Sequence, residues 1–217
     1  MNIDEFLDNS HNLGIKINRE LKNKRDYIDL ESYFLYSTIH LSHSIRVARY
    51  VEYWVHSYGK YLSVKLINDH IKNGHPFRQI FLNGLLKLVD DNFEKSGPMK
   101  KLFHQELRSN KVLIPIVPKF EFKVIDQNWK SVGISAPIFI PDEKEKTIYD
   151  LNWISKNCPE IYFRMQGISP VLSNIRAYLH FKNKSSLYRV AKDLNLTYSC
   201  VHQNYKKYVE PFNLKCP

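Results

Sequence analysis

Residues 185–208 have the sequence SSLYRVAKDLNLTYSCVHQNYKKY, which predicts two short helices joined by a tight turn. Ser185 or Ser186 can cap the first helix, because a hydroxyl accepts a hydrogen bond from its unpaired N–H groups. Asn195 suits the left-handed backbone conformation that often ends a helix. The apolar stripe of this first helix recurs at helical spacing and consists of Leu187, Val190, Ala191 and Leu194.

The second helix of this stretch begins after Leu196, which fills the corner between the two helices. Thr197 or Ser199 can provide its N-cap. Together these features predict a helix-turn-helix, a motif that lays its second helix in the major groove of DNA. An ordinary helical hairpin packed on a core is the alternative. The apolar face of the second helix repeats at intervals of four and three residues, at Val201, Tyr205 and Tyr208.

The segment AKDLNLTYSCV, residues 191–201, resembles the helix-turn-helix of phage Cro-type repressors and of winged-helix regulators. Asn195 stands where those families usually have Gly. The resemblance covers about a fifth of the chain and implies that the turn and the outward face of the second helix contact DNA. The base-reading positions implied in this sequence are Thr197, Tyr198, Ser199, His202, Gln203 and Lys206.

Positive charge is concentrated around this motif. The chain has a formal net charge of +10, and residues 164–217 contribute +7 of it, from nine Lys or Arg against Asp193 and Glu210. Clustered cations favour DNA binding, because they displace condensed counterions from the phosphates. The expected phosphate contacts flank the motif and are Lys184, Arg189, Lys192 and Lys207.

The composition predicts a cytoplasmic protein. With 217 residues, 43% of them hydrophobic, the chain can form one large domain or two small ones. It has no apolar run of about 18 residues, and its acidic N-terminus lacks the pattern of a signal peptide. Its three cysteines are few and widely spaced, which favours a reducing compartment.

The remainder of the chain predicts a mostly α-helical protein with a small antiparallel β-sheet, an α+β fold. Residues 27–109 have helical periodicity, whereas residues 112–140 have β-branched and alternating apolar residues that predict about three strands. The charged run 141–146 is the best linker candidate. We therefore expect a helical domain with the sheet in residues 1–146 and a DNA-binding domain in residues 147–217, where a helix from Ser169–Pro170 completes a three-helix unit.

Residues 1–25 predict a short helix near Ile3–Leu7 followed by a loosely packed arm. A basic arm can lie along DNA, as homeodomain arms do, and a frayed terminus is the alternative.

No motif for catalysis or metal binding is evident. His40 and His43 are three residues apart and His70 is close to His75, but no cysteine pair or H-E-x-x-H accompanies them. None of the seven glycines lies in a phosphate-binding loop, and no G-x-S-x-G is present. We expect no metal, no cofactor and no enzymatic activity. An enzyme assembled from residues far apart in the sequence stays an alternative.

These observations predict a sequence-specific protein that binds double-stranded DNA, with a transcriptional regulator, and a repressor above all, as the preferred function. A homodimer is expected, because residues 27–109 carry more apolar stripes than one helical layer buries and palindromic sites suit two-fold proteins. The alternatives are a replication initiator, the DNA-targeting part of a nuclease or recombination system, and a packaging protein without sequence preference.

Overall fold

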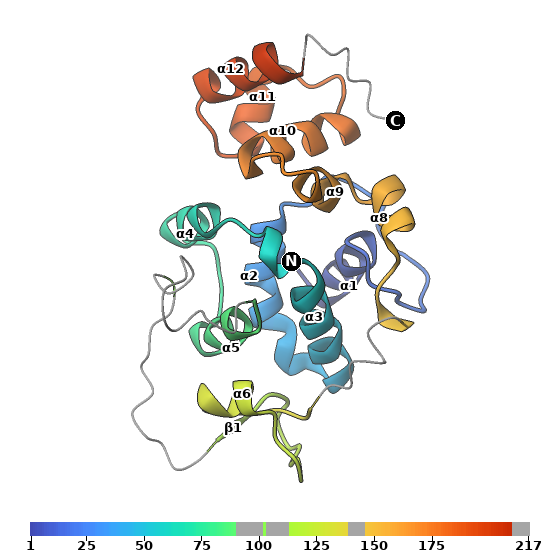
Figure 1. Cartoon of the computed structure of the whole chain (residues 1–217), viewed down its shortest axis with the longest axis vertical. Helices are drawn as coiled ribbons and strands as arrows, with labels where there is room; N and C mark the ends of the chain where they lie inside the picture. Colours follow the sequence, from blue (N-terminus) through green and yellow to red (C-terminus); the bar gives the residue numbers. More distant parts are fainter. Residues whose placement is uncertain (90–101, 103–112, 139–145, 210–217) are drawn as a thin grey trace.

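A computed structural model describes residues 1–89, 102, 113–138 and 146–209 (Figure 1). The expected linker therefore lies almost entirely outside the described residues. A larger helical part, which we call the body, occupies the lower two thirds of the view. A three-helix unit made of α10, α11 and α12 lies at its upper end. Within the described residues, no helix is long and apolar enough to cross a membrane.

Five helices build the first half of the body. Four of them begin at a side-chain cap, because Asn2, Asp29, Ser44 and Ser63 each accept a backbone N–H three residues further on. Two short 3-10 turns, Leu41–His43 and Gly59–Tyr61, connect α2 to α3 and α3 to α4. The helices are α1 (Ile3–Asn12), α2 (Leu30–His40), α3 (Ile45–Tyr58), α4 (Val64–Lys72) and α5 (Gln79–Val89).

The apolar stripes that suggested a dimer are buried inside a single chain. Trp54 is fully buried on α3, and Leu85 is fully buried on α5, which packs against α3. Gly84 of α5 lets the ring of Trp129 lie directly against the helix backbone, because a Cβ at this position would be 2.1 Å from that ring. These stripes therefore do not supply the exposed surface from which a dimer was expected.

The antiparallel sheet predicted for residues 112–140 is wrong. Within the described residues there are two strands of two residues, β1 (Ile114–Pro115) and β2 (Ile134–Ser135), and they pair in parallel with Ile114 opposite Ile134. The physical reason is the helix α6 (Gln127–Ser131), which Asp126 caps and which joins the two strands in place of a tight turn. A crossover through a helix returns the chain in the same direction, whereas a tight turn reverses it.

The alternating pattern between the two strands also misled the prediction. Phe120 and Val124 are 50% and 63% exposed and lie outside both strands. Pro115 and Pro118 remove two backbone donors from this region, which limits ladder formation. The antiparallel pairing that the described chain does contain is one bridge between Ile15 and Ile148.

Two further helices close the body, α8 (Leu151–Asn157) and α9 (Pro159–Met165). Ile154, Cys158 and Ile161 are fully buried in the main core. A second, separate core begins at α10 (Pro170–Phe181). The main core thus ends in α9 and the second core begins in α10, about twenty residues after the domain boundary that was expected after residue 146.

The N-terminal arm is held against the body, so the prediction of loose packing is wrong. The first helix extends to Asn12, and the buried carboxylate of Asp8 accepts hydrogen bonds from the backbone N–H groups of Lys22 and Asn23, at 3.1 and 3.0 Å. Arg19 also pairs with Asp8, at 3.3 Å. These contacts fix the path of the arm toward α2.

Candidate nucleic-acid interface

Three helices with a core of their own form the candidate interface: α10, α11 (Leu187–Asp193) and α12 (Tyr198–Tyr208). Their core is small and is completed by half-buried leucines and by Tyr27 of the body. Figure 1 places α12 at the outer end of the molecule, away from the body. The fully or nearly fully buried members of this core are Ile175, Tyr178, Val190, Ala191 and Val201.

The helix boundaries and the turn agree with the local predictions. Ser186 caps α11, with its Oγ 3.3 Å from the backbone N of Arg189. Thr197 caps α12, with its Oγ1 3.2 Å from the backbone N of Cys200. Asn195 has a φ of 52°, the left-handed conformation that Gly or Asn adopts most readily.

The two sides of α12 differ in exposure as expected, except at its C-terminal end. Val201 is fully buried, whereas Ser199, Gln203 and Lys206 are exposed and lie on one side because they are four and three residues apart. Tyr208, which was predicted on the inward side, is 37% exposed. Its carbonyl accepts a hydrogen bond of 2.7 Å from Arg176 of α10, which fixes the end of the helix.

The other predicted base-reading residues lie at the N-terminal half of α12. Thr197 and Tyr198 are exposed, and His202 is half-buried. The rings of Tyr198 and His202 stack with their centroids 5.7 Å apart. All six predicted base-reading residues therefore lie in the turn or on the accessible sides of one helix.

Two of the four predicted phosphate contacts already have a partner, since Arg189 pairs with an acid and Lys207 Nζ lies 4.9 Å from the centre of the Tyr208 ring. Lys184, Lys192 and Lys207 are exposed. Arg189 forms an ion pair with Asp193 in the same helix, at 3.2 Å. Hydrogen bonds from Tyr178 and then from Arg189 lower the pKa of Asp193. Arg189 must therefore share its charge between Asp193 and any phosphate.

Tyr188 is a candidate phosphate contact that the sequence analysis did not identify. It lies in the first turn of α11 and is 70% exposed, the largest exposed fraction among the large apolar side chains of the described chain. Its position one residue after Leu187, outside the apolar stripe, was the available signal. A tyrosine at the N-terminus of the first helix of the motif can donate its hydroxyl to a phosphate.

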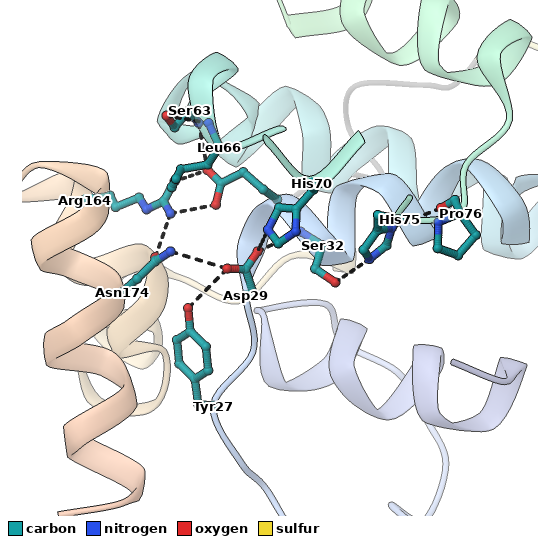
Figure 2. A network of polar contacts seen from close by, with 11 residues as sticks. Tyr27, Asp29, Ser32, Ser63, Leu66, His70, His75, Pro76, Arg164 and Asn174 are labelled. Carbon is teal, nitrogen blue, oxygen red and sulfur yellow. Dashed lines mark hydrogen bonds and ion pairs between the residues drawn. The ribbon is translucent and has the colours of Figure 1, made fainter. Parts of the chain in front are cut away.

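A buried polar network attaches the three-helix unit to the body (Figure 2). Arg164 of α9 forms an ion pair with the fully buried Glu31 of α2, and its Nη2 donates a 2.8 Å hydrogen bond to Oδ1 of Asn174 in α10. The amide nitrogen of Asn174 in turn donates to Asp29 Oδ2, at 3.4 Å. The position of α10 therefore depends on charged groups of the body.

The same network reaches α4 through a histidine. His70 Nε2 lies 3.0 Å from Asp29 Oδ1, and the hydrogen bond that His70 donates to this carboxylate raises the pKa of His70. Burial opposes ionisation of Asp29, but His70 and the N–H of Ser32 together bring the pKa of this carboxylate below its usual value. The contact is thus strongest when His70 is protonated.

A second set of contacts joins the arm to the other end of α10. The Asp26 carboxylate lies 2.9 Å from Lys182 Nζ, and the rings of Tyr27 and Tyr178 are 5.5 Å apart. Arg25 pairs with Glu160 of α9 at 3.1 Å. Burial raises the pKa of Glu160 to about 7, although Arg25 acts in the opposite direction.

The turn of the motif faces the body. Leu194, Asn195 and Leu196 line a small cavity of about 50 Å³ opposite His70 and other residues of α4. The turn is therefore held from one side, while the outward side of α12 stays accessible.

The described residues contain no group of three or more His, Cys, Asp or Glu side chains that could hold a metal ion. His70 and His75 come together, with ring centroids 5.5 Å apart, but both have polar partners in the body. Comparison of the chain with protein-family models, with curated proteins and with solved structures found no match.

Proposed function

We propose that the chain binds double-stranded DNA sequence-specifically through α12 and acts as a transcriptional regulator, with repression as the preferred mode. The observation that carries the proposal is the division of α12 into two sides. Its apolar side is buried on α10 and α11, and its polar side, with Ser199, Gln203 and Lys206, is exposed at the end of the molecule. A recognition helix needs this arrangement, because only unpaired side chains can bond to base edges.

Charge supports double-stranded DNA as the partner. Three exposed lysines, Lys184, Lys192 and Lys207, lie on the same three-helix unit as the polar side of α12. Phosphate contacts of this kind position a protein on the duplex, whereas base contacts provide the sequence preference. The hydrogen bonds of Asn174 attach α10 to the body and favour a defined orientation of the recognition helix.

Gln203 tests the proposal most directly. A glutamine can form two hydrogen bonds with adenine, and such a pair discriminates by roughly 1–3 kcal/mol. Binding-site selection from random duplex DNA with the wild type should yield one motif, and Gln203→Ala should relax the preference at one position of it. Asn183→Ala, at an exposed residue of the loop before α11, is the matched control and should leave the motif unchanged.

The symmetry and genomic position of the selected motif also distinguish a regulator from the alternative functions. A palindrome in a promoter supports regulation, and an array of repeats at a replication origin supports an initiator instead. Binding without any motif supports a packaging protein and contradicts sequence-specific reading.

We propose in addition that two copies bind a palindromic site together, because one recognition helix reads only a few base pairs. The apolar stripes of α3 and α5 are buried within one chain, so we expect the chain to be a monomer in solution and to pair on DNA. Light scattering with and without the selected duplex measures both states. A complex of one chain per palindrome would contradict the pairing.

A further inference from the structure

Two parallel strips of different chemistry lie on the accessible surface of α12. Tyr198 and His202 are one helical turn apart and form an aromatic strip. Ser199 and Gln203 follow them by one residue each and form, with Lys206, a polar strip next to it. The two strips face outward together, so a ligand in contact with one meets the edge of the other.

The aromatic strip is held in place. Tyr198 and His202 stack with a centroid distance of 5.7 Å and an angle of 27° between their planes. Tyr198 is nevertheless 51% exposed at the N-terminal end of α12, and this end of a recognition helix usually contacts base edges. A large ring that is both fixed and exposed offers an apolar contact at a low entropic cost.

The chemistry of the two strips matches an A·T base pair in the major groove. Adenine presents the N6 donor and N7 acceptor that Gln203 can bond, and thymine presents its C5 methyl group, the apolar feature of the groove. A G·C pair offers no methyl group, and its guanine edge carries two acceptors that suit Arg or Lys.

We infer that Tyr198, supported by His202, is a specificity-determining residue that contacts a thymine methyl group, so that the ligand is duplex DNA with A·T pairs under the N-terminal half of α12. This inference rests on the proposed function. It adds the identity of the base pairs and the residue that reads the thymine.

Replacement of thymine by deoxyuridine tests the contact, because it removes only the methyl group. In the selected duplex, each thymine is replaced in turn and the affinity of the full chain is measured. At one or two positions in each half-site, the wild type should lose about fourfold in affinity, which is the value of burying one methyl-sized group.

Variants connect this loss to one side chain. Tyr198→Ala should bind the thymine and deoxyuridine duplexes equally, whereas Tyr198→Phe, which keeps the ring, should retain the difference. Phe120→Ala, at an exposed aromatic ring of the body, is the matched control and should also retain it. The thermal unfolding midpoint of Tyr198→Ala should fall only slightly, since the side chain is half exposed and loses one stacking contact.

Two results would overturn the inference alone: a selected site whose binding is indifferent to every deoxyuridine, or a Tyr198→Ala protein that keeps the wild-type difference. Failure of the wild type to select any duplex sequence would overturn the proposed function as well.

Discussion

The body and the three-helix unit are stabilised in different ways. The body has a large apolar core that contains Trp54, Trp129 and most of the buried leucines. The three-helix unit has a core of five buried residues and depends on Tyr27 and on the charged network of Arg164. A small core provides little stability alone, so polar contacts with the body hold the orientation of α10, α11 and α12.

The largest expected effect on stability comes from the ion pair of Arg164 and Glu31 in the body, which a hydrogen bond to Asn174 links to α10. Arg164→Met leaves Glu31 buried without its partner and should lower the free energy of unfolding by about 3–5 kcal/mol. Urea denaturation measures this loss. Asn174→Ala removes only the link to α10 and should cost about 1 kcal/mol.

Hydrogen exchange separates the two regions in these variants. Asn174→Ala should increase exchange in α10, α11 and α12 and leave α3 and α5 protected. Equal loss of protection in both regions would show that they unfold as one unit, which would contradict the separate stabilisation of the body and the three-helix unit.

The next largest effect is on the pH dependence of stability. Burial raises the pKa of Glu160 from 4.5 to about 7, so the folded chain binds a proton more tightly than the unfolded chain. This contribution is fully present below pH 4.5, is lost as pH rises to about 7, and amounts to roughly 3 kcal/mol. Chemical denaturation at a series of pH values between 4 and 8 measures it, and Glu160→Gln should remove most of the slope.

His70 adds a smaller contribution of the same sign. Its pKa is raised above 6.5 by Asp29, so its stabilisation is present below pH 6.5 and is lost as pH rises through the higher folded value. His70→Gln should flatten this part of the curve, and His43→Gln, at an exposed histidine outside the network, should not. An NMR titration of the His70 ring that gives a value below 6.5 would contradict the prediction.

A close contact in the body provides a test that should leave the three-helix unit intact. Gly84→Ala would place a Cβ 2.1 Å from the Trp129 ring and should destabilise the chain by about 1–3 kcal/mol. Thermal unfolding measures the loss, and the affinity for DNA at low temperature should stay at the wild-type value. A large change in affinity would mean that the body core and α12 are coupled.

The smallest effects are expected at the exposed lysines. Lys184→Ala, Lys192→Ala and Lys207→Ala should each reduce the slope of log affinity against log salt by about one and leave the base preference unchanged. Asp193→Ala should raise the affinity, because it frees Arg189 from its ion pair. Lys130→Ala, at an exposed residue of α6 at the opposite end of the molecule, is the control and should change neither quantity.

Local features of the three-helix unit could be predicted from the sequence. Ser186, Thr197 and Asn195 act through their own backbone neighbours, so a short stretch of sequence contains all of the interactions. The spacing of Val190, Ala191 and Val201 likewise determined the buried sides of two short helices. The sequence by itself therefore determined the two short helices α11 and α12, the turn between them and the residues on the outward side of α12.

Only the tertiary structure decided how distant segments combine. The direction of β2 relative to β1 depended on whether residues 127–131 form a turn or a helix, and both suit that sequence. The apolar stripes of α3 and α5 gave no sign of whether they would face each other or a second copy. The ion pair of Glu31 with Arg164 joins residues 133 positions apart, and no local pattern indicates such a partner, because the free energy of a buried charge depends on its neighbours in space.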